Sequence, residues 1–267
     1  MFVLEPIFHK TLWGGNRLVP IYGGQAAGLG HLYSLRCKDE NSNIILNGKY
    51  KGKKIFSIIG GYPLSLALVD AEENLSIQVH PGGNSAKYES YYFIEAPKSE
   101  SIYCGMNRIS PEDIRTAVNK GKLLPYVKQA AVKKGSYIDI EPCTVHALTA
   151  GSLVYEIEQG EDITYRLFDY NRVDDNGKER ELQVEKAIEI LEQPLSGSCQ
   201  KPYTTKILTN VTEYINVENT CECLTLLSGN VIVEDVPLKI GMTIILEPND
   251  RLERLAIEKC IIARLLI

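Results

Sequence analysis

A short stretch of strictly alternating residues constrains the fold of this chain more than any other feature. Apolar residues stand at positions 75, 77 and 79, so the polar side chains of Gln78 and His80 share one face of a predicted β-strand. An amide oxygen and an imidazole nitrogen at positions i and i+2 of a strand can bind the same metal ion. Pro81 has no backbone N–H group, so we expect the strand to end there.

Two residues from other segments can complete a metal site with this pair. Glu89 lies in the next predicted strand, and His146 lies in a distant one that closure of a β-barrel can bring close to His80. We therefore hypothesise that Gln78, His80, Glu89 and His146 bind one divalent metal ion, with zinc as the best match to these ligand types. Such a site keeps a net charge of about +1, which suits a Lewis acid acting on an anionic substrate. A histidine in a strand is also commonly an ordinary hydrogen-bonded polar residue, and spacing alone leaves that alternative open.

Short predicted strands separated by turn residues continue along most of the chain. Helical spacing interrupts them at 110–128, where Ser110 is a suitable N-cap residue and Pro111 a suitable first residue, and again at 182–192. This pattern predicts a mostly β protein of two jelly-roll barrels with a few added helices.

A cluster of small residues at 196–198 predicts the boundary between the two barrels. The first domain, 1–195, then contains the candidate metal ligands and a helical insertion near 110–129. The second and smaller domain, 196–267, contains no histidine, so we expect no comparable metal site there.

Charge and hydropathy exclude several classes of function. The net charge is −5 and there is no basic tract, which argues against a nucleic-acid partner. No apolar run approaches the about 20 residues needed to cross a bilayer. The first residues lack the pattern of a signal peptide, so we expect a cytoplasmic protein. Seven scattered cysteines do not form a recognisable disulfide framework, and the Cys221 and Cys223 pair is a weak metal signal.

Residue type alone does not assign a function to three further residues. Trp13, in a predicted loop that contains Gly14 and Gly15, either caps an edge of the core or forms the wall of a pocket. Lys87 and Arg166 would commonly be solvated or ion-paired surface residues. The glycines at 23–30 fit neither the dinucleotide-binding fingerprint nor the P-loop.

Several segments, in order along the chain, match motifs of one enzyme family. Residues 75–81 read LSIQVHP, close to LSVQVHP; residues 87–92 read KYESYY, close to K-x-E-x-W-Y; residues 144–148 read TVHAL. Residues 156–166 read EIEQGEDITYR, close to E-x-Q-Q-x-S-D-x-T-Y-R. Shorter similarities occur at 4–6, 12–15 and 47–53. On these motifs the chain resembles the short bacterial type I mannose-6-phosphate isomerases over nearly all of its first 195 residues.

The resemblance implies a fold of two cupin domains, one Zn²⁺ per chain, and interconversion of mannose 6-phosphate and fructose 6-phosphate through a cis-enediol. The residues that match the family's zinc ligands are Gln78, His80, Glu89 and His146. The residues that match its catalytic or pocket positions are Arg166, Lys87 and Glu156, with Trp13 as an aromatic residue near the substrate. A sugar phosphate is then the expected partner, and either a monomer or a dimer is compatible with the sequence.

The chain departs from the family pattern at three places. Ala67 stands where the family often has a lysine, the loop after His80 is short and reads Gly82-Gly83, and His31 follows Gly30 where the family usually has Gly-Glu. A metal-containing sugar-binding protein of the same fold, without turnover or with another specificity, is therefore the main alternative. An iron-containing cupin oxygenase is a weaker one, because its usual three-histidine set is absent from this stretch.

Overall fold

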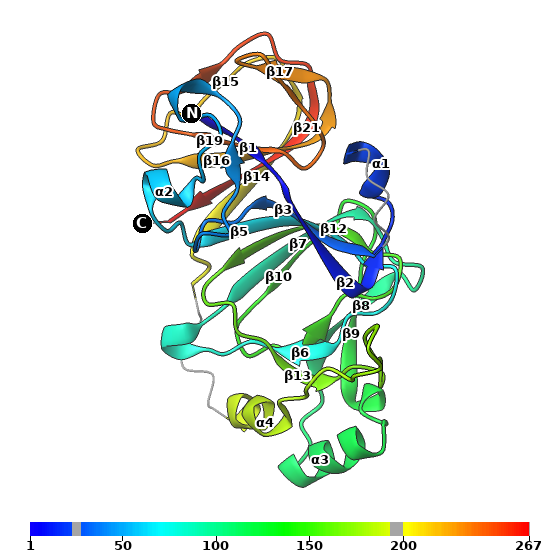
Figure 1. Ribbon diagram of the computed structural model, residues 1–267. Helices are drawn as coiled ribbons and strands as arrows, with labels where there is room; N and C mark the ends of the chain where they lie inside the picture. Colours follow the sequence, from blue (N-terminus) through cyan, green and yellow to red (C-terminus); the bar gives the residue numbers. More distant parts are fainter. Residues whose placement is uncertain (23–27, 193–199, 267) are drawn as a thin grey trace.

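A computed structural model describes residues 1–22, 28–192 and 200–266 of the 267-residue chain (Figure 1). The fold is mostly β, with several sheets and few helices, as the sequence predicted. The glycines at 23 and 24, the expected boundary at 196–198 and Cys199 lie outside the described residues. None of the described helices is long and apolar enough to cross a membrane.

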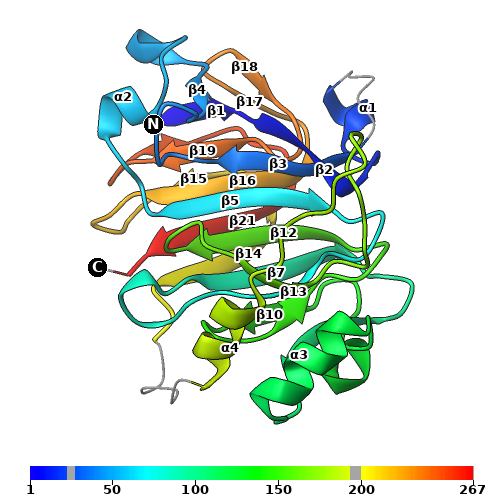
Figure 2. The same cartoon turned by 60° about the horizontal axis from the view of Figure 1, so that its bottom comes forward.

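A central six-stranded antiparallel sheet carries much of the pocket described below. Its strands, in order across the sheet, are β10 (Tyr137–Ile140), β7 (Tyr88–Glu95), β12 (Leu153–Gln159), β5 (Leu64–Asp70), β3 (Leu29–Leu35) and β2 (Ile7–Gly15). Figure 2 shows these strands lying side by side through the middle of the molecule. All seven residues of β5 are buried, so both faces of the sheet are covered.

A five-stranded sheet packs against one face of the central sheet. Its order is β13 (Tyr165–Phe168), β6 (Ile77–Val79), β11 (His146–Ala147), β8 (Ser101–Met106) and β9 (Val127–Ala131). Residues from both sheets, such as Val69 and Phe93 on one side and Ile77 and Ile102 on the other, form one buried apolar cluster. The two sheets therefore enclose one core, which forms the first unit of the fold.

A second six-stranded sheet covers the opposite face of the central sheet. Its order is β14 (Tyr203–Val211), β21 (Ile257–Leu265), β16 (Glu222–Gly229), β19 (Thr243–Leu246), β1 (Phe2–Glu5) and β4 (Ile44–Ile45). Leu66 and Tyr155 of the central sheet share a core with Cys223 and Ile261 of this one. The first strand of the chain thus belongs to a sheet built mainly from the C-terminal segment.

Two small ribbons and seven short helices complete the described structure. The ribbons pair β15 (Tyr214–Ile215) with β20 (Arg251–Leu252) and β17 (Val231–Val233) with β18 (Val236–Leu238). The helices are α1 (Val19–Tyr22), α2 (Phe56–Ile59), α3 (Pro111–Asn119), α4 (Val184–Glu192) and the 3-10 turns η1 (Gly48–Tyr50), η2 (Gly83–Ser85) and η3 (Leu124–Tyr126). Figure 1 shows α3 and α4 at the end of the molecule remote from the C-terminal strands.

The expected helical insertion near 110–129 is shorter than predicted. The Ser110 side chain accepts a hydrogen bond from the Asp113 amide and caps α3, as its position indicated, and Pro111 is the first helical residue. After α3 only the turn η3 is helical, and from Val127 the chain is the edge strand β9. Trp13 is likewise part of the long strand β2, not of a loop.

Candidate metal centre and substrate pocket

Three segments of the chain bring the four predicted metal ligands to one place. Gln78 lies in β6 and is directly opposite His146 of β11, while Glu89 comes from β7 in the facing sheet. His80 follows the end of β6, where Cys143 adopts a left-handed conformation (φ 65°) and donates its amide to the His80 carbonyl at 3.0 Å. This contact holds the segments of the two histidines together.

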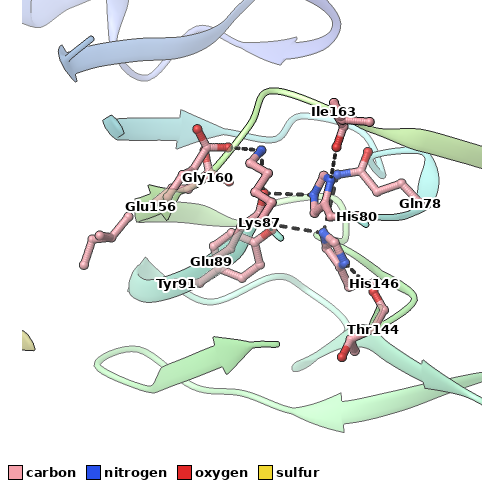
Figure 3. Close-up of polar contacts among 12 residues, drawn as sticks. Gln78, His80, Lys87, Glu89, Tyr91, Thr144, His146, Glu156, Gly160 and Ile163 are labelled. Carbon is pink, nitrogen blue, oxygen red and sulfur yellow. Dashed lines mark hydrogen bonds and ion pairs between the residues drawn. The ribbon is translucent and has the colours of Figure 1, made fainter. Parts of the chain in front are cut away.

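The side chains of His80, Glu89 and His146 are buried and converge on one point (Figure 3). The Nε2 atom of His80 lies 2.9 Å from Oε1 of Glu89, and the Nε2 atom of His146 lies 3.2 Å from Oε2. The candidate ligand atoms of the three residues all lie within 4.8 Å of one another. This spacing allows all three to contact one ion.

The backbone sets the protonation of both imidazoles. Nδ1 of His80 is 2.7 Å from the Ile163 carbonyl, and Nδ1 of His146 is 2.9 Å from the Thr144 carbonyl. A carbonyl only accepts hydrogen bonds, so both Nδ1 atoms carry a proton, and in a neutral ring the Nε2 atom then presents its lone pair. A carbonyl behind a histidine is the usual outer partner of a metal ligand.

Those two lone pairs face a carboxylate, which is unfavourable unless a cation lies between them. Burial lowers the pKa of His80, which keeps the ring neutral, and Nε2 of His80 has no hydrogen-bond partner among the described residues. Glu89 already accepts hydrogen bonds from the Tyr91 hydroxyl at 2.6 Å and from Lys87. Two imidazole nitrogens and one carboxylate oxygen fit the ligand preferences of a divalent metal ion such as zinc.

Gln78 reaches the edge of this cluster. Its amide nitrogen lies 3.5 Å from Nε2 of His146, and its amide oxygen accepts a hydrogen bond from Ser76 at 3.2 Å. A half-turn of the amide exchanges nitrogen and oxygen at almost no steric cost. The oxygen would then face the same point as the three other ligand atoms.

Lys87 lies in the pocket wall and is buried, in contrast to the solvated reading of its residue type. Its ammonium lies 2.8 Å from Oε1 of Glu89 and 2.5 Å from Oε1 of Glu158. Burial favours the neutral amine, but these two carboxylates hold the pKa of Lys87 well above its ordinary value. The charge of Lys87 is therefore balanced within the protein.

Glu156 lies on β12, and its buried carboxyl group has a different environment. Burial, followed by the nearby Glu158 and Glu89, raises the pKa of Glu156 well above its ordinary value. A carboxyl group of this kind exchanges a proton closer to neutral pH than a solvated one.

Arg166 lies on β13 opposite Gln78 and lines the same pocket. It forms no ion pair with any described acidic residue, and its Nε atom is buried without a hydrogen-bond partner in the described structure. Burial and the neighbouring Arg180 lower the pKa of Arg166, yet an arginine stays charged in proteins. Its guanidinium group is thus available to an anionic ligand.

The pocket has a volume of about 540 Å³, and the buried Trp13 and the half-buried His31 and Tyr33 form an aromatic wall. Trp13 therefore satisfies both readings of its sequence position, because it also belongs to the core cluster of the first unit. The pocket is also lined by Arg180, Asp162 and Tyr33, for which residue type and spacing predicted no role. Each comes from a different segment, and only the fold reveals their proximity.

Comparison with known proteins identifies the family. No family model matches the chain. Mannose-6-phosphate isomerase ManA of Bacillus subtilis is 32% identical over 212 residues, which cover 71% of this chain and 67% of that protein. This chain belongs to the mannose-6-phosphate isomerase family. Mannose-6-phosphate isomerase of Streptococcus mutans is similarly related, at 30% identity over 214 residues, or 70% of this chain and 68% of that protein.

Solved structures of mannose-6-phosphate isomerases have the same fold. The crystal structure of the Bacillus subtilis enzyme superimposes with a TM-score of 0.79 and 22% identity, covering 99% of both chains. A mutant of phosphomannose isomerase from Salmonella typhimurium gives a TM-score of 0.71 at 11% identity over all of both chains. The family resemblance read from the sequence motifs is confirmed.

Proposed function

We propose that this protein is a zinc-dependent aldose–ketose isomerase that interconverts D-mannose 6-phosphate and D-fructose 6-phosphate through a cis-enediol. The observation that carries the proposal is the pair of imidazole Nε2 atoms directed at the Glu89 carboxylate inside a pocket, each ring held by a carbonyl at its Nδ1 atom. The names of the relatives supply the substrate class.

We assign one zinc ion per chain to Gln78, His80, Glu89 and His146. When bound, the ion supplies Lewis-acid chemistry at the carbonyl and hydroxyl oxygens of the sugar. The buried carboxylate of Glu89 offsets part of its charge, and the two backbone carbonyls fix the imidazole rings in the ligating orientation.

The remaining pocket residues have different roles in binding and converting the substrate. Glu156 is the candidate acid–base group that carries a proton between C1 and C2, because its carboxyl group lies in the pocket wall with a raised pKa. Arg166 stabilises the oxyanion or the phosphate, because no described carboxylate neutralises its charge. Lys87, paired with Glu89 and Glu158, is better placed to assist proton transfer than to bind phosphate. Trp13 bounds the space for the sugar.

The finer description of the fold is part of the same proposal. We assign the chain to two cupin-type jelly rolls, with residues 1–195 as the metal-binding domain and 196–267 as the smaller domain. We expect it to act in the cytoplasm on a free sugar phosphate, as a monomer or a dimer.

A coupled assay of fructose 6-phosphate formation tests the proposal. Zinc-loaded protein is expected to convert mannose 6-phosphate, a chelator to abolish the turnover, and added zinc to restore it. Absence of turnover in protein that contains one zinc per chain would contradict the proposal. That result would favour the sugar-binding alternative, for which Ala67, at a position where the family often has a lysine, is the relevant departure.

A further inference from the structure

His31 has no role in the proposed chemistry, yet it lies in the pocket wall beside Glu156. It comes from β3, is half-buried, and its Nε2 atom lies 3.8 Å from Oε2 of Glu156. Among the described residues, His31 is the only group within ion-pair or hydrogen-bond reach of the Glu156 side chain. Of the other pocket carboxylates, Glu89 and Glu158 are both bound to Lys87.

Two aromatic rings fix the orientation of the His31 imidazole. Tyr33 stacks on it with ring centres 5.2 Å apart and planes 2° apart. Trp13 meets it edge-on, with ring centres 5.1 Å apart and planes at 74°. Stacked and edge-on contacts of this kind restrict ring rotation, so the direction of Nε2 is set by packing.

A small residue between the strands lets the two side chains approach. Ala67 of β5 is in register with Tyr33 of β3 on one side and with Glu156 of β12 on the other. Because successive residues of a strand alternate faces, these three residues share the pocket side of the sheet with His31. A methyl group at position 67 leaves the space across which His31 and Glu156 face each other.

The surroundings of the ring place its proton on the nitrogen that faces Glu156. Nδ1 is buried and has no hydrogen-bond partner among the described residues. A buried N–H group without a partner is rarer than a buried lone pair without one, so the neutral ring carries its proton on Nε2. Burial, with smaller contributions from His9 and Lys87, lowers the pKa of His31 to about 3, which agrees with a neutral ring.

We propose that His31 is a positioning residue for Glu156, donating a hydrogen bond from Nε2 to the carboxyl group that exchanges the substrate proton. The inference rests on the proposed isomerase function. The 3.8 Å separation is longer than a hydrogen bond, and contacts of this kind commonly shorten when substrate fills the site. The pair holds the carboxyl group in one orientation without a fixed positive charge.

Kinetics of two His31 variants test the proposal. His31→Phe keeps an aromatic ring but removes the donor, whereas His31→Gln keeps an N–H donor near the position of Nε2. We expect His31→Phe to lower kcat about tenfold or more with KM changed less than about threefold, and His31→Gln to stay within about threefold of wild-type kcat. Zinc content and thermal unfolding, measured in parallel, are expected to match wild type.

A double-mutant cycle decides whether His31 acts through Glu156. In a Glu156→Gln background, His31→Phe is expected to lower kcat less than about twofold, because the group it positions is already gone. Equal losses in both backgrounds, or wild-type kcat in His31→Phe, would overturn the proposal. Inactivity of zinc-loaded wild type would instead overturn the isomerase function itself, so the two failures are distinguishable.

A spectroscopic measurement keeps the proposal testable if the variants unfold. ¹⁵N-labelled histidine NMR of the zinc-loaded wild type at pH 7 is expected to show His31 neutral with its proton on Nε2. His80 and His146 are expected to carry theirs on Nδ1. A His31 ring protonated on Nδ1 would remove the donor and overturn the proposal.

Discussion

At the scale of single residues, the decisive feature of the site is the direction of two imidazole rings. The carbonyls of Ile163 and Thr144 each accept a hydrogen bond from an Nδ1 atom, and both Nε2 atoms therefore face Glu89. The four candidate ligands could be named from strand alternation and family motifs. The two carbonyls could not, because neither residue type nor spacing indicates which backbone oxygen lies behind a ring.

Arg166 provides a prediction at this scale. Removal of the guanidinium group in Arg166→Ala is expected to lower kcat by about 100-fold or more, because a charge aimed at a developing oxyanion stabilises the transition state. Zinc content is expected to stay at the wild-type level, since Arg166 is not among the proposed ligands.

Arg115→Ala is a matched control for the Arg166 variant. Arg115 lies on α3 and pairs with Glu185 at 2.8 Å, in the helical end of the molecule away from the pocket. Its loss is expected to leave kcat within about twofold of wild type. Near wild-type turnover of Arg166→Ala would remove Arg166 from the mechanism.

At the scale of elements, strands in which apolar and polar residues alternate clearly were predictable from the sequence, and edge strands were not. The strands containing Gln78 and Glu89 follow clear patterns. The strand β14 (Tyr203–Val211) was not predicted, because it lies at a sheet edge and only Tyr203 is fully buried. Trp13 was placed in a loop because Gly14 and Gly15 follow it. Gly14 is needed there because a Cβ would lie 2.3 Å from the Gly28 carbonyl oxygen.

The segment after β13 depends on one buried carboxylate. Asp169 binds Arg172 at 2.5 Å and Arg180 at 2.5 and 2.6 Å. Burial would raise its pKa, but the two arginines hold the pKa of Asp169 below its ordinary value of 3.8. Asp169→Asn is expected to lower the free energy of unfolding at pH 7 by about 1–3 kcal/mol, because it weakens charge-assisted hydrogen bonds.

The decrease in the free energy of unfolding caused by Asp169→Asn is expected to depend on pH in one direction. Since the pKa is lower in the folded state than in the unfolded state, the contribution of Asp169 is present above the ordinary pKa and disappears as the pH falls through the folded value. The difference between wild type and Asp169→Asn, measured by urea unfolding, is therefore expected to shrink from about pH 5 to pH 3. The exposed control Asp175→Asn is expected to change stability by less than about 0.5 kcal/mol. A difference that grows on acidification would contradict this account.

At the scale of the whole molecule, the central sheet joins two cores. One face of the central sheet packs against the five-stranded sheet, and the other face packs against the sheet that contains most of the C-terminal strands. The division predicted between residues 195 and 196 followed from composition. Composition could not show that β1 and β4, from the start of the chain, complete the C-terminal sheet.

This arrangement predicts that the C-terminal segment does not fold alone. A fragment of residues 196–267 lacks β1 and β4 and exposes apolar residues such as Cys223 and Ile261 that normally contact the central sheet. It is expected to be unfolded or aggregated by circular dichroism and size exclusion, whereas the full chain unfolds in one transition. A monomeric fragment with dispersed NMR signals would show that the central sheet is dispensable for this segment.

Metal analysis of purified protein tests the central claim most directly. Wild type and the control His9→Ala, a histidine at the pocket wall outside the ligand cluster, are expected to contain about one zinc per chain. His80→Ala and His146→Ala each remove an imidazole from the cluster and are expected to contain almost none. Zinc content equal to wild type in both ligand variants would contradict the account.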